Sequence, residues 1–109
     1  MQHVIDTKFY TFRQNNSGGK WRDNHSIGIG RYVIVEALDD DDAITRAENI
    51  GLYFDGVGDC SCCGNRWSSY VDGEEFPEVY GESYIPCEEK TDTFIHDFDG
   101  SFTFAKEVI

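Results

Sequence analysis

Residues 93–108 read TFIHDFDGSFTFAKEV, two runs of alternating apolar and polar residues separated by Asp99-Gly100. An Asp-Gly pair between two such runs is a strong hairpin signal, because glycine readily adopts the positive φ that a tight turn requires. Alternation places Phe94 and His96 on one face of the first strand, while the residues between them lie on the opposite face. The sequence therefore predicts a β-hairpin over this stretch.

Two further strands and one helix are predicted upstream of the hairpin. Residues 8–14 and 31–38 combine aromatic and β-branched residues with alternating polarity, which is typical of strands. Over 41–50, apolar residues recur at the i, i+1, i+4 and i+7 positions of a helix face. The aspartates at 39–42 supply an N-cap and acids that favour the positive end of a helix, and Gly51 follows as a C-terminal cap.

These elements predict an α+β fold in one small domain spanning residues 1–109. We expect one helix packed on an antiparallel sheet of four to five strands that includes the C-terminal hairpin and a short strand at 66–71. Parallel pairing is disfavoured, since it needs a crossover and only one helix is available. Residues 18–31 are expected to form a flexible glycine-rich loop. Residues 72–92 hold both prolines and many acids and are expected to form an irregular acidic segment.

Composition limits the classes of partner. The 109 residues contain 39% hydrophobic residues, enough for a small core, and 21 acids against 9 bases give a formal net charge of −12. By segment, residues 1–35 carry +3 and residues 36–109 carry −15. A surface of this sign repels nucleic acid and anionic lipid. We therefore expect a protein as partner rather than nucleic acid or a membrane, and the oligomeric state stays open, with a homodimer among the alternatives.

The location of the protein is predicted from two further patterns. No apolar run approaches the roughly 20 residues that a membrane span needs. The N-terminal stretch has no basic region followed by an apolar region, so a secretory signal is not indicated. We expect a reducing cytoplasm, in which cysteines are free or bound to metal rather than paired in disulfides.

The cysteines carry the most specific chemical motif. Two of them stand in C-x2-C spacing with glycine directly after, which is typical of a turn that holds zinc or iron. A structural zinc ion would stabilise so small a chain. Two alternatives stay open: reduced, partly buried cysteines without a metal, and a redox or disulfide role. The candidate zinc ligands are Cys60, Cys63 and Cys87, with Cys62, His96 or His25 as the fourth. For His96 the alternative is a semi-buried histidine whose hydrogen bonds are satisfied within the fold.

A second candidate site lies in the basic part of the chain. The side chains of Lys20, Trp21, Arg22 and Arg31, with neighbouring glycine amides, are candidates for binding an anionic ligand. The alternative is a plain hairpin loop without a ligand. The glycines at 28–30 do not form G-x-G-x-x-G, and the sequence has neither a P-loop nor G-x-S-x-G. H-E-x-x-H is also absent, so no catalytic residues are assigned.

Four blocks of sequence carry a family resemblance: FYTFRQNNSGG (9–19), AITRAENIGLYFDG (43–56), DCSCCGNRW (59–67) and FIHDFDG (94–100). With these blocks the chain resembles a family of small uncharacterised proteins of tailed bacteriophages. The resemblance implies a tailed-phage origin, a location in the cytoplasm of the bacterial host, and an accessory rather than a virion role. It implies no activity, substrate or catalytic residue.

The leading functional hypothesis is a non-enzymatic phage accessory protein that binds a host component, with its fold stapled by structural zinc. Three alternatives are kept. An acidic mimic of DNA would inhibit a nucleic-acid-binding or defence enzyme of the host, as the −15 of residues 36–109 indicates. A sponge for an anionic nucleotide signal would use the basic loop. A small zinc hydrolase would need three protein ligands and an exchangeable water.

Overall fold

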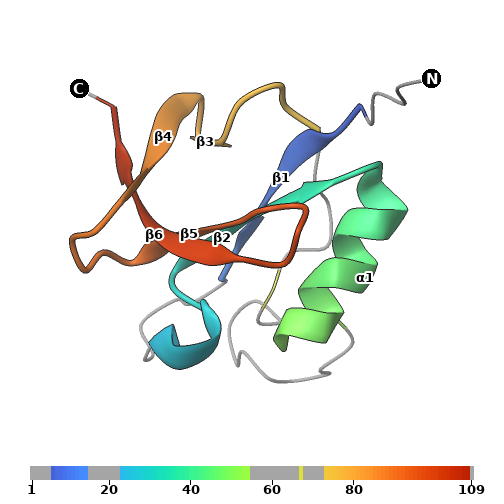
Figure 1. Cartoon of the computed structure of the whole chain (residues 1–109). Coiled ribbons are helices and arrows are strands. Elements are labelled where there is room, and N and C mark those ends of the chain that lie inside the picture. Colours follow the sequence, from blue (N-terminus) through green and yellow to red (C-terminus); the bar gives the residue numbers. More distant parts are fainter. Residues whose placement is uncertain (1–5, 15–22, 55–66, 68–72, 109) are drawn as a thin grey trace.

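The computed structural model describes residues 6–14, 23–54, 67 and 73–108, and the fold is described for these residues. Six strands form one sheet in the order β1-β2-β5-β6-β4-β3, accompanied by the helix α1 (Asp40–Ile50) and the short 3-10 helix η1 (His25–Ile27) (Figure 1). The strands are β1 (Lys8–Arg13), β2 (Tyr32–Ala37), β3 (Glu78–Val79), β4 (Glu82–Cys87), β5 (Thr93–His96) and β6 (Phe102–Glu107).

The sheet is mixed and nearly closed, so the prediction of one helix on an antiparallel sheet of four to five strands is wrong. β2 pairs in parallel with β5, with Val33 opposite Phe94. The long connection between β2 and β5 contains α1, β3 and β4, so a single helix is enough for one parallel pair. At the far ends of the sheet, Phe9 and Glu74 exchange two backbone hydrogen bonds of 2.8 and 2.9 Å. This contact brings the β3 segment back to β1 and makes the sheet barrel-like.

The predicted irregular segment at 72–92 contains β3 and β4, so that prediction is also wrong. Tyr80 and Gly81, with φ of 53° and 81°, form the two-residue turn between these strands. Pro86 is compatible with β4 because its backbone nitrogen points away from β6. Tyr84, two residues earlier, donates its N–H to Pro77 O, away from β6, so the proline at 86 removes no hydrogen bond of the β4–β6 ladder.

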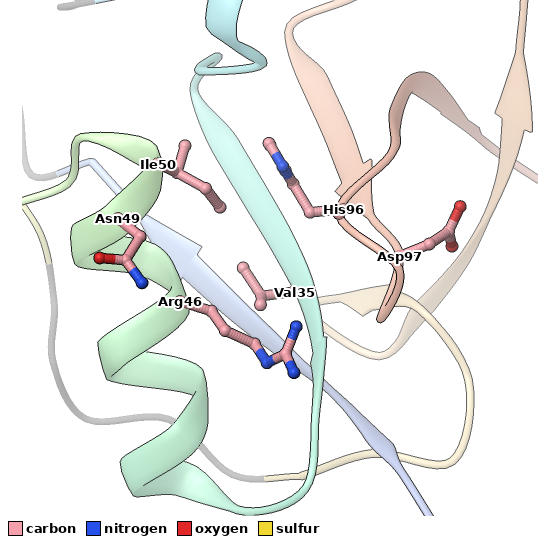
Figure 2. A pocket seen from close by; sticks show the side chains of 7 residues that line it. Val35, Arg46, Asn49, Ile50, His96 and Asp97 are labelled. Carbon is pink, nitrogen blue, oxygen red and sulfur yellow. The ribbon is translucent and has the colours of Figure 1, made fainter.

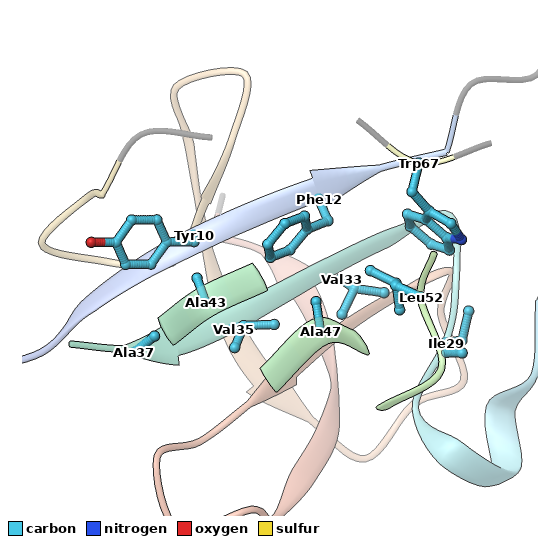
Figure 3. Packing of buried hydrophobic residues seen from close by; sticks show 10 residues of the cluster. All are labelled: Tyr10, Phe12, Ile29, Val33, Val35, Ala37, Ala43, Ala47, Leu52 and Trp67. Carbon is cyan, nitrogen blue, oxygen red and sulfur yellow. The ribbon is translucent and has the colours of Figure 1, made fainter. Parts of the chain in front are cut away.

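The curved sheet separates two apolar clusters. Inside the barrel, Ile34, Val79, Ile95 and Ala105 are buried, and they come from four different strands. On the outer face, alternate residues of β1 and β2 pack against α1, as the period of a strand requires (Figure 3). The buried members of this outer cluster are Tyr10, Phe12, Ile29, Val33, Val35, Ala37, Ala43, Ala47, Leu52 and Trp67.

Local sequence accounts for α1 and the C-terminal hairpin, and both predictions are confirmed. The Asp39 side chain accepts a hydrogen bond from Asp42 N at the start of the helix, and Gly51 caps its end. Asp42 also forms a salt bridge at 2.9 Å with Arg46, which lies one helical turn further along. The predicted hairpin is β5 and β6, joined by a turn in which Gly100 has a φ of 94°. Of the short strand predicted at 66–71, the described residue is Trp67, which forms an isolated bridge with Gln14.

Candidate functional site

Two separate parts of the chain cover the outer face of the sheet, and both are called lids here without implying movement. The first lid is α1, which covers β1 and β2. The second lid is the 24–30 segment, which includes η1 and covers β5 and β6. His25 of η1 places its ring edge-on to Phe94 and Phe104, at centroid distances of 5.3 and 5.4 Å. Gly28 lies so close to the sheet that an added Cβ would be 2.6 Å from two ring atoms of His96. This part of the predicted flexible loop is therefore packed against the sheet, and residues 18–22 lie outside the described chain.

His96 is built into this second lid. Its ring is 5% exposed, stacks on Phe102 at 5.0 Å and has Nε2 at 2.7 Å from Gly28 O. A carbonyl oxygen only accepts, so Nε2 carries the proton and donates it. Burial lowers the pKa of His96 below its ordinary value, against weaker raising contributions from the Gly28 hydrogen bond and Asp97. Burial thus favours the neutral form of His96, and its Nε2 is occupied by the backbone.

The structure places only part of the predicted metal site. Cys60, Cys62 and Cys63 lie outside the described residues. Cys87 is a half-buried free thiol whose Sγ is 3.5 Å from Glu89 O. In the described ranges, no three His, Cys, Asp or Glu side chains come together as a metal site.

The described candidate ligands are Cys87, His25 and His96, and of these Cys87 and His96 are not neighbours. Cys87 pairs with Phe104 on β6, and Phe104 pairs with Phe94 on β5, so Cys87 and His96 are separated by two strand spacings and a two-residue offset. Strands lie about 4.8 Å apart and rise about 3.4 Å per residue, which puts the two backbones roughly 12 Å apart. Zinc binds its ligand atoms at about 2.0–2.3 Å. One zinc ion therefore does not join Cys87 and His96 in this arrangement, and the metal prediction rests on the 60–63 motif.

The predicted anion site is also described only in part. Lys20, Trp21 and Arg22 lie outside the described residues. Arg31 precedes β2, and its Nη1 lies 3.5 Å from the Asp92 carboxylate, with both side chains partly exposed. Its backbone carbonyl accepts a hydrogen bond from Gln14 N. The guanidinium is thus turned toward an acid of the β4–β5 connection, which offsets its attraction for an anionic ligand.

A pocket of about 210 Å³ opens between the two lids, with Val35 and His96 on the sheet side and Arg46, Asn49 and Ile50 on α1 (Figure 2). Arg46 reaches across from the helix to the β5–β6 turn, where Nη1 donates to Phe98 O at 3.0 Å. Its Nε is bound to Asp42, so two faces of the guanidinium are committed to the fold.

The polar groups of this pocket serve mainly to hold it together. The Arg46 guanidinium also lies 4.1 Å from the centroid of the Phe98 ring, and Phe98 N donates to the Glu36 carboxylate at 2.9 Å. Figure 2 shows Asp97, which also lines the pocket, pointing away from Arg46 and His96. Without convergent acid, base or nucleophile, this geometry positions the β5–β6 turn against α1 rather than preparing a reaction.

A different surface stands out at the place where the sheet closes. Phe76 is 65% exposed and Tyr80 is 71% exposed, although the backbone around them is firmly held. Glu74 pairs with Phe9 before Phe76, and Val79 is buried inside the barrel before Tyr80. Large exposed aromatics on a fixed backbone are typical of contact surfaces rather than of solvent-facing loops.

Sequence reasoning missed this surface because residues 72–92 were interpreted by composition alone. The signal was available in VYGES (79–83), in which a two-residue turn containing glycine separates short alternating runs. Tyrosine in place of the usual asparagine or aspartate before that glycine obscures the turn.

Of the comparisons with known proteins, one identifies a family, and that family has no assigned function. Among the described residues, no helix is long and apolar enough to cross a membrane. No curated protein and no solved structure matches the sequence significantly. A family model does match, over residues 7–106, which is nearly the whole chain and includes all six strands apart from the last residue of β6. The chain belongs to the family described as a domain of unknown function, DUF7296.

Proposed function

We propose that this protein is a non-enzymatic binding protein that engages a basic surface of a host protein. The observation that carries the proposal is the charge of the C-terminal half of the sheet. Residues 73–108, which supply β3 to β6, contain ten acidic residues and two basic ones, Lys90 and Lys106. Lys106 is itself paired with Glu89 at 3.1 Å. The remaining carboxylates give this side of the barrel a strongly negative field.

Such a field favours one kind of partner. Complementary charge accelerates encounter and excludes partners of the same sign, which include nucleic acid and anionic membranes. The resemblance to phage proteins supports an accessory role in the cytoplasm of an infected bacterium. A structural zinc ion at the 60–63 motif remains part of this proposal as a staple of the fold.

The pocket geometry supports binding rather than catalysis. Arg46 is held by Phe98 O and Asp42, and His96 Nε2 is held by Gly28 O. Groups engaged in this way stabilise the fold but lack the freedom to exchange protons with a substrate.

The test is to express the full chain with a photo-crosslinking amino acid at position 82 in a bacterial host and to identify crosslinked proteins by mass spectrometry. We expect one basic protein above background, whose purified form binds the full chain with an affinity that falls steeply as salt rises. If the captured protein is a DNA-binding enzyme that DNA displaces from the complex, the partner is that of a DNA mimic. Absence of any reproducible partner, or metal-dependent turnover that is lost in Cys60→Ser, would contradict the proposal.

A further inference from the structure

The segment that closes the barrel presents an alternating row of acids and aromatics, Glu74, Phe76, Glu78 and Tyr80, called here the seam row. Phe76, Tyr80 and Glu74 are exposed, and Glu78 is half-buried. Between Glu78 and Tyr80, Val79 turns into the barrel, and Tyr80 lies in the turn that follows, against Arg13 and Tyr32. The row therefore offers two exposed rings and neighbouring carboxylates along one short segment.

The backbone of the seam row is fixed before any partner arrives. Glu74 exchanges two hydrogen bonds with Phe9, and Glu78 O accepts from the Thr11 hydroxyl. Tyr84 N donates to Pro77 O at 2.8 Å, which ties the middle of the segment to β4. Binding of a partner here costs this chain little conformational entropy, because the segment is already ordered.

Tyr80 occupies a turn position at which tyrosine is not a favoured residue. Its φ of 53° makes it the one described non-glycine residue with positive φ, and the first position of this two-residue turn favours asparagine or aspartate. Tyrosine there costs conformational energy, and 71% of it is exposed, so burial in the core returns little of that energy. Contacts of Tyr80 with Arg13 and Tyr32 return part of this cost, and the residue still stays largely exposed, as is typical of a contact residue.

The seam row already holds one guanidinium. Arg13 of β1 lies with Cζ 4.9 Å from the centroid of the Tyr80 ring, and its Nη1 donates to the Tyr80 hydroxyl at 2.7 Å. Tyr32 meets the same ring edge-on, at a centroid distance of 6.1 Å. Arginine therefore has the chemistry that this ring accepts, and arginine also pairs with carboxylates through two parallel hydrogen bonds.

We propose that the seam row docks an arginine-bearing segment of a partner protein, with guanidinium groups stacked on Phe76 and Tyr80 and paired with Glu74 and Glu78. This inference rests on the proposed function and names the surface and the chemistry of the partner. Arginine is favoured over lysine because lysine offers a point charge that neither stacks as well nor forms a fork of hydrogen bonds.

The experiment uses the full chain and two synthetic probes of equal charge and length, one with four arginines alternating with glycine and one with four lysines alternating with glycine. Binding is followed by amide chemical shifts in ¹⁵N-labelled protein and by calorimetry. We expect the arginine peptide to bind at least fivefold more tightly than the lysine peptide, with the largest shifts in residues 74–82.

Two substitutions and a matched control separate the ring contacts from charge and from folding. Phe76→Ser and Tyr80→Asn each remove a ring while leaving the charge unchanged, and asparagine suits the turn at least as well as tyrosine. Each is expected to weaken binding of the arginine peptide at least fivefold. Phe76→Ser should leave the melting temperature unchanged, and in Tyr80→Asn the better turn residue should offset most of the loss of the Arg13 and Tyr32 contacts. Ile27→Ser, which removes another exposed apolar side chain from η1, is expected to leave binding unchanged.

The outcomes separate this inference from the proposed function. Equal binding of both peptides, or binding that survives Phe76→Ser and Tyr80→Asn, overturns the seam row as the docking site. In that case, a crosslinked basic partner with salt-sensitive binding still supports the proposed function. If a partner is found and both ring variants lose it together with the arginine peptide, both proposals are supported. If neither peptide binds, the seam-row inference fails, and the crosslinking experiment alone decides the proposed function.

Discussion

Gly28 is the residue at which the packing of the second lid is tested most directly. Its φ of 76° is costly for a residue with a side chain, and a Cβ at this position would lie 2.6 Å from His96 Cε1 and Nε2 and 2.8 Å from Phe102 Cδ2. The His96 ring is buried and lacks room to withdraw, whereas Phe102 is 38% exposed and can give way more easily. Gly28→Ala must therefore either displace His96 or lift η1 from the sheet.

The magnitude follows from three contributions. Positive φ in an alanine costs about 1 kcal/mol. Overpacking against well-packed rings costs about 1–3 kcal/mol, and weakening the His96–Gly28 hydrogen bond costs about 1 kcal/mol more. We expect Gly28→Ala to lower the free energy of unfolding by about 3–5 kcal/mol.

Gly81→Ala is the matched control, because Gly81 has a similar φ of 81° but no atom within 4 Å of an added Cβ. It should cost about 1 kcal/mol, for the backbone conformation alone. Urea unfolding followed by tryptophan fluorescence and circular dichroism measures both variants. A difference of about 2–4 kcal/mol between them is expected, which corresponds to roughly 10–15 °C in melting temperature. Equal costs for the two variants would refute close packing of the 24–30 segment on His96.

Three further predictions follow from single groups. His96 has a lowered pKa, so the unfolded chain takes up a proton that the folded chain refuses, and stability should fall as pH drops below about 6.5. Between pH 7.5 and 5.5 the free energy of unfolding should fall less in His96→Gln, whose amide still donates to Gly28 O, than in the unsubstituted protein. An equal fall in both proteins would show that His96 is not the source of the pH dependence. Asp39→Ala removes the helix N-cap and should cost about 1 kcal/mol, whereas the exposed Asp41→Ala should cost close to nothing; equal effects in thermal unfolding would count against the cap. Element analysis should find one zinc ion per chain that is lost in Cys60→Ser, with a lower melting temperature after chelation, and a metal-free protein with unchanged melting would disprove the zinc site.

The elements that sequence predicted correctly are those specified within a few residues. The helix at 41–50 follows from apolar spacing and an N-cap, and the structure begins it one residue earlier, at Asp40. β2 follows from the alternation of Val33 and Val35 with Ile34, whose side chains face α1 and the barrel interior respectively. In each case the local pattern and the tertiary environment favour the same structure, which is the condition under which such patterns succeed.

The parts that sequence missed depend on partners far along the chain. β5 could be recognised as a strand, but its parallel pairing with β2 depends on a connection of more than fifty residues, and alternation carries no information about pairing direction. The pocket was missed for the same reason. Arg46 matches the solvent face of a helix in sequence, whereas its hydrogen bond to Phe98 O spans 52 residues.

The seam illustrates why composition misled the interpretation of 72–92. Many acids and two prolines indicate an irregular loop on average. However, β3 needs only Glu78 and Val79, and the backbone nitrogen of Pro86 points away from β6. A short, acidic, proline-bearing edge also limits unwanted pairing with other chains, so the same residues that hide the strands protect them. Phe76 and Tyr80 do not fit this protective role, because exposed aromatics promote association. This edge carries both many charged residues and two exposed aromatic rings. Selective contact with one complementary partner explains both features, whereas solubility alone explains only the charged residues.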